Sequence, residues 1–324
     1  MNQPILEVKD ITKTFTKSTR TREFKTIAVD HVSVSLQEGE TLGIIGESGS
    51  GKTTLARILV KLIQPDSGYV YLRGRDVTHA TGSILREFRN TVQMIFQDPY
   101  ASLDPRLTVK QLISDFLRMR GKPIDTYAEY LSLVNLDESL AEKRPNELSG
   151  GQRQRDAIAR VLSLQPRVIL ADEPVSSLDV SVRLQILDLL AQMHRKLGVT
   201  LAVITHDIST LPVLAKRVCV MYSGEIVEEG PIDSIIREPL HPYTKALVAA
   251  IPDFGKTLVR VSELTRGEAD SETNTIIGCK YSPRCPYAAE LCRKVKPTLT
   301  TLNTGRKVAC HIYSDEFDKT KIET

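Results

Sequence analysis

The stretch TLGIIGESGSGKTTLARILVKLI, residues 41–63, decides the fold. It opens on a short apolar run of the kind found in parallel strands that are buried on both faces. A glycine-rich turn follows, and then a segment in which Leu55, Ile58, Leu59 and Leu62 recur on one face of a helix. A strand, a glycine loop and a helix in this order predict an α/β fold that binds a nucleotide.

The turn itself, GESGSGKT at residues 46–53, fits the phosphate-binding P-loop pattern. Its glycines let backbone amides point inward at phosphate groups, while Lys52 reaches the terminal phosphates and Thr53 offers its hydroxyl to Mg²⁺. The pattern therefore predicts a P-loop NTPase. The residues expected to bind the nucleotide in this loop are Gly46, Glu47, Ser48, Gly49, Ser50, Gly51, Lys52, Thr53 and Thr54.

Two carboxylates follow a second buried strand in RVILADEP, residues 167–174. Asp172 is expected at the carboxyl end of this strand, beside the P-loop, where it can hold Mg²⁺ or its water ligands. Glu173 points in another direction, because adjacent residues at a strand end face different ways. A carboxylate there can orient and deprotonate a water in line with the terminal phosphate. The pair predicts hydrolysis of the nucleotide as well as binding.

A second anion site is indicated by NELSGGQRQR at residues 146–155. Ser149 and two glycines expose backbone amides where an amphipathic helix begins near Gln152, and the positive end of a helix favours an anion. The chain already has a phosphate loop earlier in the sequence, so the question is what a second one holds.

Composition places the chain among ordinary globular proteins, with 324 residues, 41% of them hydrophobic and 26% charged. The length is that of one large domain with an appendage, or of two domains. A net charge of +3, without a basic patch that carries interleaved aromatics, argues against nucleic acid as a partner. The chain shows no signal-peptide pattern and no apolar run of transmembrane length. We expect a protein on the cytosolic side of a membrane.

The pattern along the chain divides it into two parts. Between residues 105 and 165 helical patterns replace strands, which predicts a helical subdomain inserted into the sheet domain. Alternating apolar residues at 32, 34 and 36 predict an antiparallel β subdomain. Proline-rich turn segments, REPLHPY and KYSPRCPY, place a boundary near residue 250. We expect a nucleotide-binding domain at 1–250 and a C-terminal extension at 251–324. Strands are expected at residues 5–9, 29–36, 92–96, 167–172 and 200–205.

Taken together, the motifs resemble those of ABC ATPases over roughly residues 5–230. In chain order they are GESGSGKT (46–53), Gln97 in MIFQDPY, LSGGQ (148–152), RVILADEP (167–174), SSLD (176–179) and His206 in ITHD. The resemblance implies a head-to-tail dimer with ATP and Mg²⁺ sandwiched between subunits, so that the second loop completes the partner's site. The residues that would reach the ATP of the partner subunit are Ser149, Gly150, Gly151, Gln152 and Asp179.

The resemblance also implies roles for single residues. Gln97 is expected to contact Mg²⁺ or the water, with a buried amide bonded elsewhere as the alternative. His206 is expected to contact the terminal phosphate and Glu173, although a lone histidine is more often structural. Asp179 would cross the dimer interface, or cap a helix that begins near residue 180, or do both. Phe15 matches the aromatic residue that stacks on adenine; the alternative is a core phenylalanine. Glu173, His206 and Gln97 are thus the expected catalytic residues, and Thr53, Gln97 and Asp172 the expected Mg²⁺ ligands.

Three classes of ABC protein compete: the motor of a membrane transporter, a soluble protein of translation, and an ATPase of DNA repair. The single cassette, with no coiled-coil heptads between its motifs, favours a transporter. QDPYASLDPRLTV (97–109) and EPLHPYTKALVAAIP (238–252) resemble segments of the peptide and nickel importer family. This resemblance implies two membrane permease subunits, a second related ATPase subunit, and indirectly an extracytoplasmic solute-binding protein. It places the chain peripherally on the cytoplasmic face, with residues 97–110 lining a groove for the permease. Peptides are the expected solute, and nickel or another small solute is the alternative.

Four of the five cysteines fall near the C-terminus, at Cys279, Cys285, Cys292 and Cys310. A cytosolic chain argues against disulfides, and the intervening spacings of five, six and seventeen residues lack the paired knuckles of zinc ribbons. Four thiolates at this spacing fit an iron–sulfur cluster better. The resemblance to the importer family extends to this cysteine segment and implies a 4Fe–4S cluster there. Zinc and free cysteines remain the alternatives, and His311 is expected to be a bystander.

Overall fold

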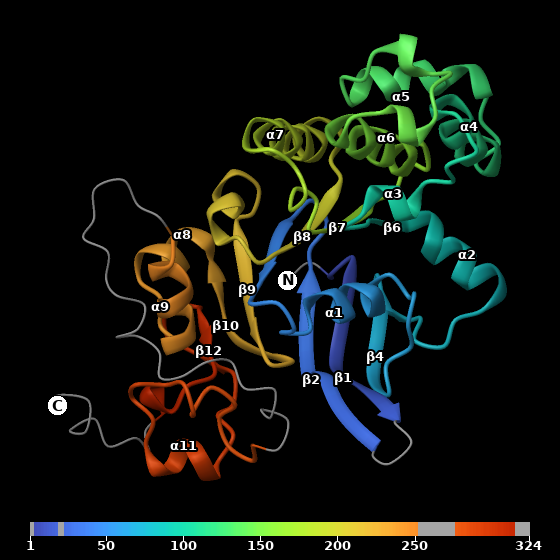
Figure 1. Ribbon diagram of the computed structural model, residues 1–324. Coiled ribbons are helices and arrows are strands. Elements are labelled where there is room, and N and C mark those ends of the chain that lie inside the picture. Colours follow the sequence, from blue (N-terminus) through green and yellow to red (C-terminus); the bar gives the residue numbers. More distant parts are fainter. Residues whose placement is uncertain (1–2, 19–22, 252–275, 315–324) are drawn as a thin grey trace.

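The computed structural model describes residues 3–18, 23–251 and 276–314. They form two β-sheets with helices packed around them (Figure 1). The smaller sheet is antiparallel and has the order β2-β1-β4-β5. Its strands are β1 (Leu6–Ser18), β2 (Glu23–Leu36), β4 (Ser67–Leu72) and β5 (Arg75–Asp76). Val32, Val34 and Leu36 are buried in it, which confirms the alternation predicted for an antiparallel strand.

The larger sheet has eight strands in the order β11-β12-β10-β9-β3-β8-β7-β6. The five strands from β9 to β6 are parallel to their neighbours, whereas β10, β12 and β11 join in antiparallel pairs. The strands are β3 (Thr41–Ile45), β6 (Val92–Ile95), β7 (Val168–Asp172), β8 (Thr200–Thr205), β9 (Arg217–Tyr222), β10 (Glu225–Pro231), β11 (Thr300–Thr301) and β12 (Lys307–Val308).

The middle of the large sheet is buried on both faces. In β7, Val168 and Leu170 join the apolar cluster between the two sheets, while Ile169 and Ala171 join the cluster under the helices on the other side. This period of two explains why the strand reads as a continuous apolar run, as the sequence predicted.

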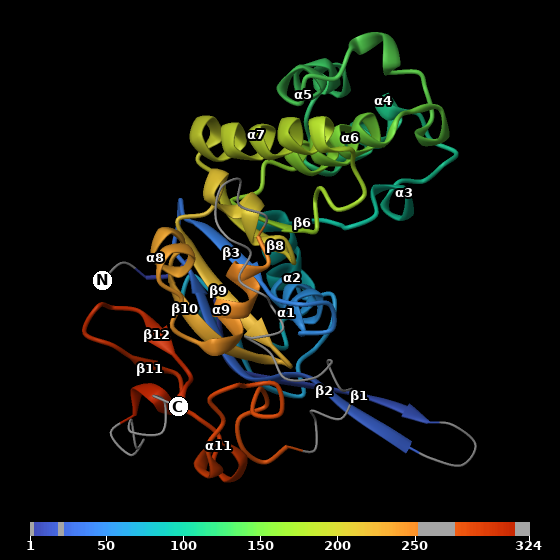
Figure 2. The ribbon, with the colours of Figure 1, turned by 60° about the vertical axis from the view of Figure 1, so that its left-hand side comes forward.

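Helices cover both faces of the large sheet and form a cluster at one end of it (Figures 1 and 2). Helix α1 packs on β1 and β2 of the small sheet and on β7 and β8 of the large one, and α6 packs mainly on α4 and α5. The helices are α1 (Lys52–Leu59), α2 (Gly82–Thr91), α3 (Pro99–Ser102), α4 (Val109–Met119), α5 (Tyr127–Leu133), α6 (Gly150–Ser163), α7 (Val180–Leu197), α8 (Ile232–Arg237), α9 (Pro242–Ala249) and α11 (Glu290–Lys294). Short 3₁₀ turns span Ile124–Thr126, Glu138–Leu140, Pro145–Glu147, Ile208–Val213 and His311–Tyr313.

One prediction for α1 is wrong. Leu55, Ile58 and Leu59 are buried as the helical pattern predicted, but Leu62 is 52% exposed. The helix ends at Leu59, and Lys61 adopts a positive φ of 56°, so the face shared by the first three residues does not continue to the fourth.

The C-terminal residues are attached to the large sheet. Strand β12 pairs with β10, so Val308 lies opposite Glu228. The Glu228 carboxylate is fully buried, where it accepts a 2.6 Å hydrogen bond from Arg306 and further bonds from the backbone N–H groups of Leu240 and His241. A buried carboxylate needs such partners, because an uncompensated charge in the interior is costly.

No helix in the described part of the chain has the length and apolar character needed to cross a membrane.

An ionisable side chain without partners lies inside α6. Asp156 is fully buried, and neither of its carboxylate oxygens has a hydrogen-bond partner among the described residues. Burial raises the pKa of Asp156 from 3.8 to about 7, with Arg160 opposing part of the shift. The folded chain therefore keeps a proton that the unfolded chain loses above pH 4, so this group costs stability as the pH rises from about 4 to about 7.

Asp156→Asn should remove this pH dependence, because the amide is uncharged at every pH. The unfolding free energy of the variant minus that of wild type should be larger at pH 8 than at pH 5, by on the order of 2 kcal/mol. Urea denaturation at the two pH values measures this difference. The matched control is Asp188→Asn on the surface of α7, which should differ from wild type by the same amount at both pH values. An Asp156→Asn difference that does not change with pH would contradict the assignment.

Candidate active site

The P-loop joins the central strand β3 to α1, so it lies at the carboxyl end of the most buried part of the large sheet. Residues Gly46–Gly51 form the loop, and Lys52, Thr53 and Thr54 form the first turn of α1. Gly51 has a φ of +99°, and a Cβ there would lie 2.0 Å from the carbonyl oxygen of Ala28. Only glycine fits this position. Any other residue would strain the backbone at this φ, and its Cβ would clash with the Ala28 carbonyl oxygen.

Lys52 folds back on its own loop. Its Nζ donates hydrogen bonds to the carbonyl oxygens of Gly46 at 2.7 Å and Glu47 at 2.9 Å, and the residue is 6% exposed. Burial lowers the pKa of Lys52, while the carboxylates of Glu173, Asp172 and Glu47 oppose the shift. The ammonium group is thus fixed at the loop, surrounded by oxygen atoms.

Thr53 and Asp172 lie side by side, as the sequence predicted for a pair of Mg²⁺ ligands. The Thr53 hydroxyl donates a 3.2 Å hydrogen bond to Oδ1 of Asp172 at the end of β7. Burial is the main factor that raises the pKa of Asp172; the bond from Thr53 lowers it, and neighbouring Glu173 raises it further. A divalent cation here would bind the carboxylate and the hydroxyl with hard oxygen atoms, the ligand type that Mg²⁺ prefers.

Glu173 and His206 form a pair at the ends of two adjacent strands, β7 and β8. His206 Nδ1 lies 2.8 Å from Oε1 of Glu173, and the glutamate side chain is 11% exposed against 56% for the histidine. Glu173 has a φ of +48°, and its N–H donates to the carbonyl oxygen of Ile204. A left-handed backbone is uncommon at a residue other than glycine, and here it sets the direction of the Glu173 side chain at the end of β7.

Gln97 lies at the same edge of the sheet, two residues after β6, which pairs with β7. Its side chain is exposed, so the alternative that it is a buried amide is wrong. The next residue, Asp98, accepts a hydrogen bond from the Tyr100 N–H and begins α3.

The second anion-binding segment lies on a different group of elements. Ser149 caps α6, its hydroxyl accepting from the Gln152 N–H, and the Gln152 side chain accepts from the Ser149 N–H. The helix begins at Gly150, two residues earlier than expected. Its main packing partners are α3, α4, α5, α7 and β6, whereas α1 packs on the strands of the two sheets. The two segments predicted to bind phosphate therefore lie on separate parts of the fold (Figure 1).

Two further predicted residues lie at exposed positions. Phe15 on β1 is 45% exposed, with the Lys13 ammonium 5.8 Å from its ring centre, so the alternative of a core phenylalanine is wrong. Asp179 occupies the cap position before α7, but its side chain makes no capping hydrogen bond. Both side chains remain available to a ligand or a neighbouring subunit.

The four C-terminal cysteines line one small pocket, together with His241, Tyr281 and neighbouring residues. None of the four forms a disulfide in the part of the chain that the structure describes, and burial raises the pKa of Cys279 and of Cys310 to about 12. As placed, no three histidine, cysteine or acidic side chains within the described ranges are close enough to share one metal ion. His311 Nε2 lies 2.9 Å from the Val295 carbonyl oxygen. Cys219 is fully buried in β9, as expected of a small apolar residue.

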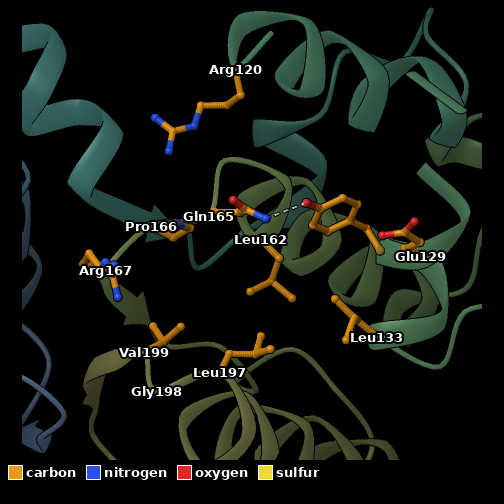
Figure 3. Close-up of a pocket in the computed structure, with 11 residues that line it drawn as sticks. Arg120, Glu129, Leu133, Leu162, Gln165, Pro166, Arg167, Leu197, Gly198 and Val199 are labelled. Carbon is orange, nitrogen blue, oxygen red and sulfur yellow. Dashed lines mark hydrogen bonds between the residues drawn. The ribbon is translucent and has the colours of Figure 1, made fainter. Parts of the chain in front are cut away.

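A hollow of about 470 Å³ lies elsewhere, between α5 and the ends of α6 and α7 (Figure 3). Arg167 and Val199 in its wall directly precede β7 and β8, so it lies at the amino ends of these strands. Arg120 and Arg167 are among the residues that line it (Figure 3). It contains none of the predicted nucleotide residues, which are at the other edge of the sheet.

Sequence reasoning missed two residues that contact the P-loop. The Glu47 N–H donates a 2.8 Å hydrogen bond to the hydroxyl of Tyr243, and the Glu47 carboxylate pairs with Arg284 at 2.9 and 3.2 Å. Both residues belong to the proline-rich segments that we interpreted as a domain boundary, as an importer-family segment and as part of the cysteine cluster, but not as contacts of the P-loop. Nothing in the local pattern links them to the P-loop.

Comparisons with known proteins identify the family of the chain. The ABC transporter family pattern matches residues 29–176, and the pattern described as the oligopeptide/dipeptide transporter, C-terminal region matches residues 227–292. A protein of Sinorhizobium fredii named "Probable peptide ABC transporter ATP-binding protein" is 42% identical over 96% of this chain and 91% of its own length. The oligopeptide transport ATP-binding protein of Bacillus subtilis is 39% identical over 96% and 98%.

Solved structures give the same result. An ATP-binding cassette solved as a dimer in a post-hydrolysis state with ADP and Pi is 31% identical, with a TM-score of 0.63 over 70% of this chain and 98% of that one. A cassette of a Clostridium perfringens ABC transporter complex is 28% identical, with a TM-score of 0.64 over 73% of this chain and 92% of that one.

The fold and the site define an ATP-hydrolysing ABC cassette. The chain belongs to the ABC transporter ATP-binding subunits of the oligopeptide/dipeptide importer family, whose members work with membrane permeases.

Gly51→Ala should abolish ATP binding, because the new methyl group would displace the loop from the Ala28 carbonyl. It should also cost roughly 3 kcal/mol of unfolding free energy, measured by chemical denaturation with and without ATP. Gly49→Ala is the matched control: its φ is +81°, but a Cβ there meets no atom within 4 Å. It should cost only the backbone strain, about 1 kcal/mol. Equal losses in the two variants would contradict the close contact.

Proposed function

We propose that this chain is the motor subunit of a peptide importer, bound peripherally to the cytoplasmic face of the membrane. The proposal is carried by one observation: the Thr53–Asp172 and Glu173–His206 pairs lie at neighbouring strand ends beside the P-loop. A site of this kind can hold a nucleoside triphosphate, its metal ion and an attacking water at one place.

In the proposed reaction, the P-loop amides and Lys52 hold the phosphates. Thr53, Asp172 and Gln97 would hold Mg²⁺, which neutralises charge on the phosphate oxygens. Glu173 accepts the proton of the attacking water, and His206, 2.8 Å away, fixes the glutamate and contacts the terminal phosphate. Phe15 would stack on the adenine ring.

We propose that the site is completed by a second subunit. Ser149, Gly150, Gly151, Gln152 and Asp179 would bind the ATP held by the partner's P-loop. The separation of α6 from α1 within the fold supports this, since one nucleotide has no evident need of two phosphate loops on different parts of one chain. The similar cassette solved as a dimer with ADP and Pi offers a precedent. The family resemblance favours a related but different chain as partner.

Coupling to the permease would pass through residues 97–110. Arg160 on α6 donates to the carbonyl oxygen of Ser102 in this segment, and its guanidinium lies 5.2 Å from the ring centre of Phe116. The helix that Ser149 caps is therefore bonded directly to the segment that follows Gln97. A motion of α6 on dimer closure would reach the permease groove through this bond.

The partners we propose are two permease subunits, a second ATPase subunit and, indirectly, an extracytoplasmic solute-binding protein. Peptides are the proposed solute because the curated relatives are named for peptide transport. We also propose the division of the chain into a nucleotide-binding domain, 1–250 with its helical subdomain at about 105–165, and a C-terminal extension, 251–324.

We further propose a 4Fe–4S cluster on the four C-terminal cysteines. The shared pocket supports it: all four cysteines line it, and none forms a disulfide among the described residues. The intervening spacings of five, six and seventeen residues, without the paired knuckles of zinc ribbons, favour a cluster over a single zinc ion. When bound, the cluster would supply structural crosslinks between the segments that carry the cysteines.

Glu173→Gln tests the motor assignment, because an amide cannot take the proton of the water. We expect ATP turnover of the purified subunit to fall by about 10²- to 10³-fold while ATP remains bound and an ATP-dependent dimer accumulates in gel filtration. Adding Ser149→Arg should abolish that dimer, since the bulky cation fills the anion site at the interface. Exposed Glu142→Gln should behave like wild type. Near-normal turnover of Glu173→Gln would refute its role as the base.

Iron and acid-labile sulfide in anaerobically purified protein test the cluster. We expect about four of each per chain, and their loss in Cys285→Ser. Cys219→Ala should retain both, because Cys219 lies in β9 away from the pocket. A colourless protein without iron would refute the proposal, and one equivalent of zinc in its place would establish the alternative.

A further inference from the structure

A short loop of the C-terminal segment, Cys279–Cys285, reaches from the cysteine pocket to the nucleotide site. Its two end residues line the pocket. Between them, Lys280 is 6% exposed and pairs with Asp30 at 2.8 Å and with Glu225 at 3.0 Å. Lys280 thus forms two ion pairs, one with Asp30 on β2 and one with Glu225 on β10. Both pairs are largely shielded from water, so they fix the loop against these strands.

The loop directs one arginine at the P-loop. Arg284 forms a two-pronged ion pair with Glu47, its two terminal nitrogens 2.9 and 3.2 Å from the two carboxylate oxygens. Its guanidinium carbon also lies 5.9 and 5.8 Å from the ring centres of Tyr222 and Tyr281. A planar guanidinium held by two oxygens and two rings has little freedom, so its geometry is specific to arginine.

Glu47 makes a contact through each of its polar groups: the N–H, the carbonyl oxygen and the carboxylate. Its N–H donates to the Tyr243 hydroxyl, its carbonyl accepts from Lys52, and its carboxylate pairs with Arg284. The side chain of Arg284 therefore acts on the same residue that receives the ammonium group expected to meet the phosphates. A shift of Glu47 would move Lys52 as well.

The charge of Glu47 explains why this contact matters. A carboxylate within a loop that must receive a polyanion repels it, and because the Glu47 side chain is only 40% exposed, solvent screens this repulsion in part and does not remove it. Arg284 neutralises that charge from outside the loop. Without the arginine, the P-loop would carry a free negative charge and a side chain with no fixed position.

We propose that Arg284 is a positioning residue that neutralises Glu47 and thereby sets the affinity of the P-loop for nucleotide. The C-terminal segment is then part of the ATP-binding machinery as well as an appendage to it. This inference rests on the proposal that the loop holds ATP.

Equilibrium titration with a fluorescent ATP analogue measures the effect without hydrolysis. Arg284→Gln should raise the Kd by about 5- to 20-fold, because Glu47 is left uncompensated. Arg284→Lys keeps the charge but loses the two-pronged geometry, so its Kd should rise by about 2- to 3-fold. In steady-state assays Arg284→Gln should raise the KM for ATP with kcat changed by less than about 2-fold.

The double variant Glu47→Gln with Arg284→Gln separates this role from a general loss of structure. With no carboxylate left to neutralise, its Kd should return to within about 3-fold of wild type. Arg293→Gln, an exposed arginine of α11 in the same segment, is the matched control and should bind like wild type. Thermal unfolding of each variant confirms that it is folded.

The inference is overturned if Arg284→Gln binds as tightly as wild type, or if the double variant binds as weakly as Arg284→Gln alone. Should Arg284→Gln not fold, Arg284→Lys decides, and an unchanged Kd in that variant overturns the inference. Lys52→Ala distinguishes the two proposals. If it leaves binding intact, the P-loop assignment has failed; if it abolishes binding while Arg284→Gln does not weaken it, only the role of Arg284 has failed.

Discussion

The parallel pairing of β3, β8, β7 and β6 is the constraint on which the rest of the site depends. Because these strands run in one direction, their carboxyl ends meet at one edge of the sheet. That edge receives the P-loop after β3, Asp172 and Glu173 after β7, His206 after β8 and Gln97 after β6. One backbone hydrogen-bonding pattern thus assembles residues separated by more than a hundred positions in the chain.

The same edge concentrates charges of opposite sign in a partly buried space. Lys52 lies among three carboxylates that oppose the effect of burial on its pKa, while burial and Glu173 act together on Asp172. A bound metal ion and bound phosphates would stabilise such a site. The metal ion adds positive charge beside the carboxylates, and the phosphates add negative charge beside Lys52. On the outer side of the loop, Arg284 likewise gives the Glu47 carboxylate a partner of opposite charge.

Much of the fold and site could be predicted because the signals are local. A buried strand, a glycine turn and a helix are adjacent in residues 41–63, and a capping serine identifies the start of α6 within one turn. The end of α1 could not be predicted, since Leu62 fits the helical pattern but the backbone turns at Lys61. The roles that we propose for Ser149–Gln152 and Asp179 depend on a second subunit, so the structure of one chain does not reveal them.

The sequence by itself determined the nucleotide fold, the positions of its phosphate and carboxylate motifs, and the family. The tertiary structure alone decided that the C-terminal segment joins the large sheet through β12, that four dispersed cysteines line one pocket, and that Arg284 meets Glu47. The last two residues are 237 positions apart. Contacts at such separations depend on the path of all the chain between them, and no periodicity or short motif encodes that path.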